Sequence, residues 1–208
     1  MTGTEAIVHI VDDDPSMRTA VAALLRSVGM RSATYESCLD FLAAAPSDVA
    51  GCLLLDVRLP GLSGLDFQAR MRELGVELPV IMITAHGDVP MTVRAMKAGA
   101  VDFLPKPFRD QDLLDAVNAA IAQDVRRRAA GDQIRALRAL HESLSLRERQ
   151  VMALVTAGLL NKQAAHELGL SEITVKIYRA GAMKKMGART LAELVRMAER
   201  LNSGDGRP

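Results

Sequence analysis

Carboxylates, one hydroxyl and one ammonium follow short apolar runs in the first half of the sequence. The triplet at 12–14 and Asp56 each come directly after such a run, and Thr84 and Lys106 stand in the same position after two others. Clustered carboxylates repel one another and are typical of a site for Mg²⁺ or another divalent cation. A lysine beside them can neutralise phosphoryl oxygens. These residue types therefore indicate phosphoryl transfer to a carboxylate.

These side chains can meet only if the apolar runs are strands of one parallel sheet. The runs are bounded by Asp, Gly or Pro and alternate with segments of helical spacing, which predicts a sheet with helices on both faces. Its strands would bring their carboxyl ends to one crevice. The predicted strands are Ala6–Val11, Arg31–Tyr35, Cys52–Leu55, Val80–Ile83 and Ala100–Leu104, and the predicted helices include Ser16–Val28, Gly64–Leu74 and Pro90–Ala98.

The aspartate triplet also has a simpler interpretation, because aspartates cap helices. Asp14 stands directly before Pro15, a residue that favours the first turn of a helix. A capping role for Asp14 is compatible with a cation site formed by its neighbours. The matching positions of Asp56, Thr84 and Lys106 favour the phosphoryl-transfer interpretation for the whole set.

The second half of the sequence differs in charge and in pattern. Residues 1–120 carry a net charge of −6 and residues 121–208 a net charge of +7. The region 142–201 has no strand signal, and glycine-containing breaks divide it into four short predicted helices. A small, basic, all-α domain is typical of a protein that meets a polyanion.

Between these regions, the pattern from Gln111 to about Leu140 is helical and increasingly charged. It predicts a last helix of the first domain that continues as a linker. The arginine run at 126–128 is interpreted as a solvated face, and Gly131–Asp132 as the flexible point. The resulting domains are residues 1–122, a helical linker at 123–141, a helical domain at 142–202 and a disordered tail at 203–208.

Within the helical domain, the segments on either side of Gly169–Leu170 predict a helix-turn-helix, with Asn161 and Ser171 as N-caps. The buried face of the second helix is predicted from residues that recur at spacings of 3, 4 and 4, namely Val175, Tyr178, Ala182 and Met186. The remaining surface suits the DNA major groove and flanking phosphates, although a protein-docking module is an alternative. The candidate DNA-contacting residues are Lys162, Thr174, Lys176, Ile177, Arg179, Ala180, Lys184 and Lys185.

Several other classes of protein are not expected. The sequence has no apolar run long enough for a membrane span and no signal peptide pattern at Met1, so we expect a cytoplasmic protein without membrane partners. Cys38 and Cys52 lack the spacing of a zinc or redox site, and we expect two reduced, buried thiols without a chemical role.

Residues 5–122 resemble the receiver domains of two-component response regulators, through VDDD at 11–14, LDVRLPGLSG at 55–64, ITAHGD at 83–88 and MKAGAVDFLPKPF at 96–108. The resemblance implies a doubly wound, five-stranded, flavodoxin-like sheet, and a sensor histidine kinase that phosphorylates Asp56. It also implies that Asp13, Asp56 and the backbone carbonyl of Arg58 hold Mg²⁺, with Asp12 assisting through water.

The same resemblance makes Thr84 and Phe103 a switch pair and Lys106 a phosphate contact, with a cis bond between Lys106 and Pro107. The physical logic is that a new dianion draws the Thr84 hydroxyl inward and vacates space for an aromatic ring. Without the motif, Phe103 would be interpreted as a core residue. His86 lies near the mouth of this site, where it could tune the lifetime of the phosphoryl group or be a solvated loop residue.

Residues 144–198 resemble LuxR-type DNA-binding domains, and the whole chain resembles FixJ/NarL-type transcriptional regulators, in the FixJ-like branch. This implies an activator that binds double-stranded promoter DNA as a homodimer, with RNA polymerase as a further partner. Receivers of that branch pair through the region at about Val89–Phe103. Tyr178 and Gly181 replace the usual His and Asn, so the DNA sequence preference of relatives cannot be transferred.

The function predicted from the sequence is a phosphorylation-switched transcription factor that is not an enzyme. The alternatives are a dimeric DNA-binding regulator that does not depend on phosphorylation, a Mg²⁺-dependent phosphatase with an aspartyl-phosphate intermediate, and a small-molecule sensor. The phosphatase would need a second acid near the nucleophile, and Val57 and Arg58 after Asp56 offer none. The sensor would need a ligand pocket, and aromatic residues make up only 3% of the chain.

Overall fold

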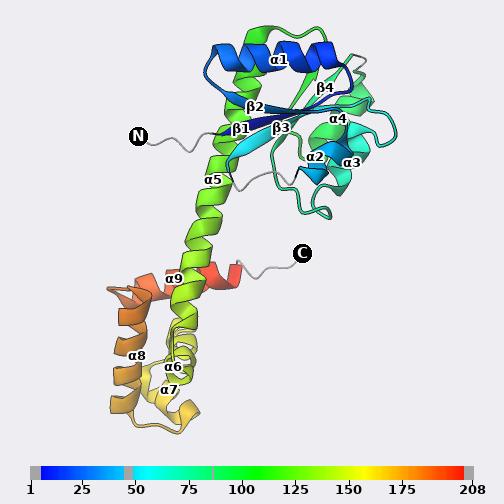
Figure 1. Ribbon diagram of the computed structural model, residues 1–208. Coiled ribbons are helices and arrows are strands. Elements are labelled where there is room, and N and C mark those ends of the chain that lie inside the picture. Colours follow the sequence, from blue (N-terminus) through cyan, green and yellow to red (C-terminus); the bar gives the residue numbers. More distant parts are fainter. Residues whose placement is uncertain (1–5, 45–48, 86, 204–208) are drawn as a thin grey trace. The chain divides into compact units, whose positions relative to one another are not determined.

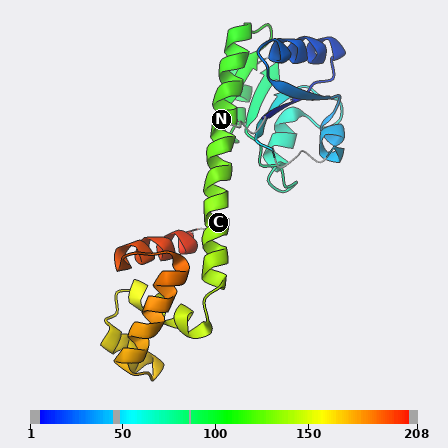
Figure 2. The same ribbon diagram turned by 60° about the vertical axis from the view of Figure 1, so that its left-hand side comes forward.

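The computed structural model describes residues 6–44, 49–85 and 87–203, which divide into two compact units. The first unit spans residues 1–128 and the second spans residues 129–208. The first is an α/β unit and the second is helical (Figures 1 and 2). Over the described part of the chain, no helix combines the length and the apolar character that a membrane crossing requires.

A five-stranded parallel sheet forms the centre of the first unit, with strand order β2-β1-β3-β4-β5. The central strand β3 is buried along its whole length, which explains why its sequence is a nearly continuous apolar run. The predicted sheet is therefore confirmed, and each predicted strand agrees with an observed one to within two residues at either end. The strands are β1 (Ile7–Val11), β2 (Arg31–Tyr35), β3 (Gly51–Asp56), β4 (Val80–Thr84) and β5 (Asp102–Pro105).

Alternate side chains of the strands enter two separate cores, one on each face of the sheet. On one face, Leu54 and Ile81 pack with side chains of α1 and α5. On the other face, Leu53 and Met82 pack with side chains of α2, α3 and α4. The helices are α1 (Pro15–Ser27), α2 (Cys38–Ala43), α3 (Gly64–Arg70), α4 (Val89–Lys97) and α5 (Asp110–Glu142).

Local sequence explains where most of these helices begin. Asp14 caps α1 by accepting the Ser16 amide hydrogen, and Asp88 caps α4 in the same way through the Met91 amide. The helix α2, which the sequence analysis did not assign, begins after Ser37 and is only six residues long. The helix α3 ends earlier than predicted, because the chain continues in turns after Arg70.

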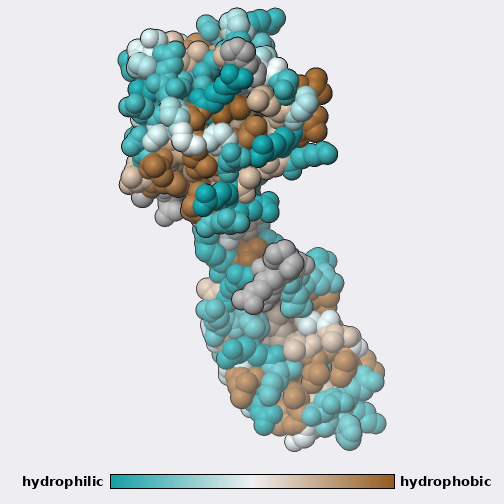
Figure 3. All heavy atoms as spheres, turned by 90° about the vertical axis from the view of Figure 1, so that its right-hand side faces the viewer, coloured by the Kyte–Doolittle hydropathy of each residue, from teal (hydrophilic) through white to brown (hydrophobic). Residues whose placement is uncertain are grey.

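The second unit has its own core, built from the end of α5 and from α6 (Leu146–Thr156), α7 (Asn161–Leu168), α8 (Glu172–Met186) and α9 (Leu191–Ser203). Val151, Ala164, Val175, Ala182 and Leu194 are fully buried there. Hydrophobic residues also interrupt the mostly hydrophilic surface of both units (Figure 3). Of the tail predicted at 203–208, Ser203 ends α9 and the rest lies outside the described residues.

One predicted N-cap in this unit is wrong. Asn161 is the first residue of α7 rather than its cap, and the preceding Leu160 amide donates instead to the side chain of Gln163. The Asn161 side-chain oxygen instead accepts a hydrogen bond from Arg179 of α8. Ser171 caps α8 through the Thr174 amide, as predicted.

The long helix α5 runs through Gly131 without a break. Near the end of the first unit, its Asp124 is completely buried and accepts hydrogen bonds from the Gly51 amide, Arg127 and Arg128. Burial by itself would raise the pKa of Asp124, but the hydrogen bonds from Arg128, Arg127 and the Gly51 amide lower it overall. We call Asp124 and these three partners the Asp124 clamp.

The interpretation of residues 126–128 as a solvated face is confirmed only in part, because Arg126 and Arg127 are exposed but the clamp uses two of the three arginines. Arg127 and Arg128 both bind Asp124, and Arg127 also binds Glu77. Gly51 is required at the start of β3, because a Cβ atom there would lie 2.2 Å from the Ile7 carbonyl oxygen of β1. The clamp therefore fastens α5 to a point where two strands approach closely.

We expect replacement of Asp124 by Ala to lower the free energy of unfolding of the first unit by about 2–3 kcal/mol, because it removes several hydrogen bonds to a charged acceptor. Arg127 and Arg128 keep contact with water, so the loss should be smaller than for a fully buried ion pair. Urea unfolding, followed through the NMR signals of the Tyr35 ring, measures this loss in the free energy of unfolding.

The matched control is Asp112→Ala, which removes an exposed partner of Arg109 at the start of the same helix and in the same unit. Such surface pairs contribute at most about 1 kcal/mol. Equal stability of the Asp124→Ala chain and its control would mean that the clamp is not a stabilising element.

Candidate functional site

The carboxylates predicted for a cation site do lie together at the carboxyl ends of β1 and β3. These strands are neighbours, with Val11 paired to Leu55, so the residues that follow each of them are adjacent. One carboxylate oxygen from each of Asp12, Asp13 and Asp56 lies within 4.8 Å of the others. Asp12 and Asp56 are buried, whereas Asp13 is exposed. Three carboxylates at this spacing suit a hard divalent cation.

Lys106 reaches the same cluster from the end of β5. Its ammonium lies 2.7 Å from Asp12 Oδ2 and 2.7 Å from Asp56 Oδ2. Burial disfavours the ammonium, but the hydrogen bonds to Asp12 and Asp56 outweigh this effect and raise the pKa of Lys106. The peptide bond between Lys106 and Pro107 is cis, as expected. The lysine thus holds a positive charge between two carboxylates.

Backbone amides orient the carboxylates from the loops that follow the strands. The Arg58 amide donates to Asp56 Oδ1 at 3.0 Å, and the Asp14 amide donates to Asp12 Oδ1 at 2.9 Å. Arg58 and Asp13 line a hollow of about 500 Å³ beside the cluster. The site is therefore reachable from solvent on the side of Asp13.

Gly64 is a constraint on this site that the sequence analysis missed. A Cβ atom at Gly64 would lie 2.1 Å from the backbone oxygen of Asp56, so no other residue allows the chain to pass so close to the end of β3. The Gly64 amide donates to the Val57 carbonyl at 3.0 Å. The two glycines at 61 and 64 were the available signal, because glycine permits backbone segments to approach each other closely.

Thr84 and Phe103 lie next to each other beside a second glycine. A Cβ atom at Gly87 would lie 2.8 Å from Phe103 Cε1 and 3.2 Å from Thr84 Cγ2. Thr84 is completely buried, while Phe103 is half-buried and packs against the core under α4. The structure therefore brings together the two residues expected to switch. His86 lies outside the described residues.

In the second unit, α8 buries the face that the spacing predicted. Val175, Ala182 and Met186 are buried and Tyr178 is half-buried. Among the candidate DNA-contacting residues, Lys176, Ile177, Ala180 and Lys184 of α8 and Lys162 of α7 are exposed. Ile173 is also exposed, to 71%, and the sequence analysis did not include it. The sequence could have indicated it, because Ile173 lies four residues, or about one helical turn, before Ile177 and therefore on the same face of the helix.

Three of the other polar candidates already have partners within the unit. Arg179 is half-buried and donates to Asn161 Oδ1 at 3.1 Å. Thr174 shares a hydrogen bond of 2.7 Å with the Ser171 hydroxyl. Lys185 forms an ion pair of 2.7 Å with the buried Glu148 of α6. These contacts hold α8 against its neighbours.

Glu148 also explains the environment of Gly181. A Cβ atom at Gly181 would lie 2.7 Å from Glu148 Oε1, so this part of α8 faces α6. Glu148 completes a capping box with Ser145 at the start of α6. The hydrogen bond from Lys185, followed by the Ser145 amide, lowers the pKa of Glu148 to about 2.

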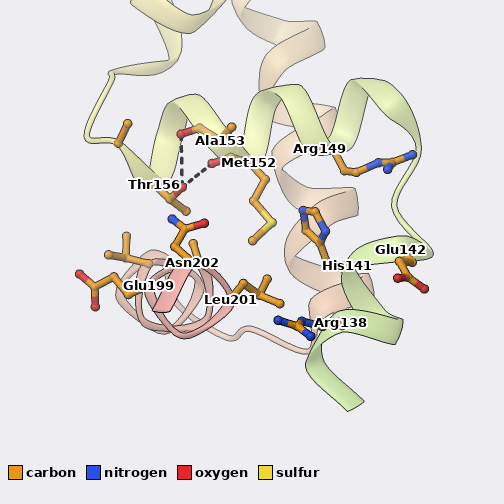
Figure 4. Close-up of a pocket in the computed structure, with 13 residues that line it drawn as sticks. Arg138, His141, Glu142, Arg149, Met152, Ala153, Thr156, Glu199, Leu201 and Asn202 are labelled. Carbon is orange, nitrogen blue, oxygen red and sulfur yellow. Dashed lines mark hydrogen bonds between the residues drawn. The ribbon is translucent and has the colours of Figure 1, made fainter. Parts of the chain in front are cut away.

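A further hollow of about 580 Å³ lies in the second unit between the end of α5, α6 and α9 (Figure 4). Arg138 and Arg149 line it together with Glu142 and Glu199, and Met152 contributes an apolar side chain. Because two arginines and two glutamates line the hollow, their charges balance, and the hollow offers no net positive charge to a phosphate. It is therefore a weaker candidate for the polyanion contact than the exposed surface of α8.

Comparisons with known proteins match both units. The family "Response regulator receiver domain" matches residues 8–118, and the family "Bacterial regulatory proteins, luxR family" matches residues 142–198. Nodulation protein W of Bradyrhizobium diazoefficiens is 58% identical over 95% of this chain and 87% of that protein. Transcriptional regulatory protein FixJ of Rhizobium meliloti is 44% identical over 94% of this chain and 96% of that protein.

The fold comparison agrees with the sequence comparison. The solved structure of response regulator StyR matches 94% of this chain and 99% of its own, with a TM-score of 0.83 and 45% sequence identity. The match therefore includes both the α/β unit and the helical unit.

We expect the stability of the second unit to depend on pH through Glu148. Because its pKa is lowered in the folded unit, Glu148 stabilises the fold above about pH 4.5, and this contribution is lost as the pH falls toward about 2. A Glu148→Gln chain should be less stable at pH 7 and should lose less stability on acidification. Urea unfolding between pH 7 and pH 2.5, followed through the Tyr178 ring, tests this.

Glu167→Gln serves as the control, because Glu167 is an exposed residue of α7 in the same unit. The Glu148→Gln and Glu167→Gln chains could both have the same free energy of unfolding as the wild type at every pH. In that case the ion pair between Glu148 and Lys185 does not stabilise the unit.

Proposed function

Because this chain belongs to the two-component response regulators that join a receiver domain to a LuxR-type DNA-binding domain, we propose that phosphorylation of Asp56 by a sensor histidine kinase controls its dimerisation and promoter binding. The observation that carries the proposal is the arrangement of Asp12, Asp13, Asp56 and Lys106 at one edge of the sheet. It provides a nucleophile, cation ligands and a positive charge for phosphoryl oxygens.

In the proposed reaction, Asp56 attacks the phosphorus of a phosphohistidine of the kinase. The bond between carboxylate oxygen and phosphorus forms as the bond between phosphorus and histidine nitrogen breaks, and the imidazole leaves. Asp13, Asp56 and the Arg58 carbonyl would hold Mg²⁺, with Asp12 acting through water. The cation would neutralise charge on the carboxylates and the phosphoryl group. The Lys106 ammonium, which already binds Asp56, would follow the phosphoryl oxygens.

Phosphorylation would then change the surface next to Thr84. The Thr84 hydroxyl can bond to a phosphoryl oxygen, and Phe103 can turn into the space beside it. The position of Gly87 supports this step. Because Gly87 has no Cβ atom, the Thr84 and Phe103 side chains can lie directly against its backbone. The change would reach β5, which contains Phe103, and α4, whose Ala95 belongs to the core that Phe103 packs against.

The surface of α4 supports dimerisation of the receiver through the region at about Val89–Phe103. Val89, Val93 and Met96 are exposed to 77%, 44% and 45%, and their spacing of 4 and 3 puts them on one face of the helix. Three apolar side chains in a row are a suitable centre for a symmetric interface. Two receivers joined there would present two DNA-binding domains to a two-fold DNA site.

The exposed lysines of α7 and α8 support contact of the helix-turn-helix with double-stranded promoter DNA. Dimers would bind more tightly than monomers, because the second domain binds at a high effective concentration. The relatives are transcriptional regulators, and we propose that this chain likewise acts on transcription, as an activator that works with RNA polymerase. No catalytic turnover is part of this function.

We expect Asp56→Asn to abolish the response to phosphorylation, since an amide cannot accept the phosphoryl group. The measurement compares oligomeric state by light scattering and promoter-DNA affinity, with Mg²⁺ and either a phosphoryl donor, beryllofluoride or neither. The wild type should form dimers and bind DNA more tightly with either reagent. The Asp56→Asn chain should stay unchanged, and Asp115→Asn, which alters an exposed carboxylate of the same unit, should behave as wild type.

Undiminished activation of the Asp56→Asn chain by its kinase would overturn the mechanism. A wild-type chain that is dimeric and binds DNA equally well without modification would instead support the regulator that does not depend on phosphorylation.

A second prediction separates phosphorylation from dimerisation. Val93→Glu puts a charge in the middle of the exposed apolar face of α4, and we expect this chain to accept the phosphoryl group but to remain monomeric at concentrations where the wild type pairs. Phosphate incorporation and light scattering on the same samples test this. Leu39→Glu is the control, because Leu39 is exposed to 71% on α2, which packs against β1 and β2. Dimers of the Val93→Glu chain would exclude α4 as the interface.

A further inference from the structure

The outward face of α8 is apolar where a DNA-reading helix usually carries hydrogen-bonding groups. Ile173, Ile177 and Ala180 are exposed, with Ile173 at 71% and Ile177 at 65%. Their spacing of 4 and 3 puts them on one face of the helix, opposite the buried Val175 and Ala182. We call Ile173, Ile177 and Ala180 the apolar stripe.

The polar side chains on either side of the stripe are engaged with neighbours. Lys176 pairs with Glu172 at 3.2 Å, Arg179 with Asn161, and Thr174 with Ser171. The centre of this face, at Ile173, Ile177 and Ala180, therefore presents methyl groups, and the polar side chains lie at its borders.

Charge identifies the occupant of this face as a polyanion. Lys184 continues the same face one turn after Ala180, and Lys162 is exposed on α7. The only large apolar feature of base edges in the major groove is the C5-methyl group of thymine. A stripe of methyl groups bordered by lysines is complementary to thymine methyls bordered by phosphates.

We propose that Ile173 and Ile177 determine DNA sequence preference by packing against the C5-methyl groups of two thymines in the major groove. This inference rests on the proposed function, in which α8 enters that groove. Four helical residues span about 6 Å, and successive base pairs are about 3.4 Å apart. The two thymines therefore lie about two base steps apart in each half of the DNA site.

The test begins with the full-length chain, treated with Mg²⁺ and beryllofluoride, and selects bound duplexes from a random library. In the selected duplex, each thymine is then replaced in turn by deoxyuridine, which lacks only the methyl group. At constant salt, two replacements about two steps apart should each weaken binding about fourfold, the usual effect of one buried methyl group. The Ile173→Ala and Ile177→Ala chains should each lose sensitivity to one of these replacements.

Leu191→Ala is the matched control, because Leu191 is an exposed apolar residue of α9 in the same unit. Circular dichroism checks that every variant is folded. The Leu191→Ala chain should keep both the affinity and the deoxyuridine sensitivity of the wild type.

Other outcomes overturn the inference in distinguishable ways. If binding is sequence-selective but does not change on replacement of thymine by deoxyuridine, the proposed thymine contacts are wrong and the proposed DNA binding still holds. Isoleucine variants that bind DNA as the wild type does but fail to activate transcription assign the stripe to a protein partner. A chain that binds no duplex under any condition removes the proposed function itself.

Discussion

Repulsion among Asp12, Asp13 and Asp56 is the constraint on which the first unit depends. Two of these carboxylates are buried, where an unpaired negative charge is costly, and Lys106 supplies a positive charge at 2.7 Å from each of them. The lysine follows β5, whereas Asp12 and Asp13 follow β1 and Asp56 is the last residue of β3. Their meeting requires that β1, β3, β4 and β5 lie side by side with their carboxyl ends at one edge, which is the order that the sheet adopts.

The strand β3 carries the proposed phosphate acceptor and is held at both of its ends. At its start, Gly51 lets β3 approach β1 and donates its amide to Asp124, while at its end the backbone of Asp56 lies against Gly64. Both contacts depend on the absence of a side chain. Movement of Asp56 along the strand direction is thereby restricted, so a change in its charge is more easily accommodated by neighbouring side chains such as Thr84 and Phe103. This favours a switch based on side-chain rearrangement.

The sequence predicted those features that follow from local pattern. Arg31–Tyr35 was assigned with its observed bounds, and the positions of Asp56, Thr84 and Lys106 at strand ends implied that they meet. Features that depend on distant partners were missed or misassigned. Asn161 has the residue type of an N-cap, but it lies inside α7 and its side chain binds the distant Arg179. Arg127 and Arg128 look solvated, because no local pattern indicates that Asp124 is buried beside Gly51, far away in the sequence.

The same distinction explains how charge is used in the second unit. A lysine on a basic helix is a plausible phosphate contact by sequence, yet Lys185 lies against Glu148, which is itself fixed by the capping box at the start of α6. A positive charge that neutralises a buried carboxylate contributes less to the attraction of DNA than a solvated one. In the proposed function, the exposed Lys162 and Lys184 contribute more to the attraction of DNA, whereas Lys176 is paired with Glu172 on the surface of α8. Because those residues attract any sequence equally, selectivity has to arise from the shape and the apolar groups of α8.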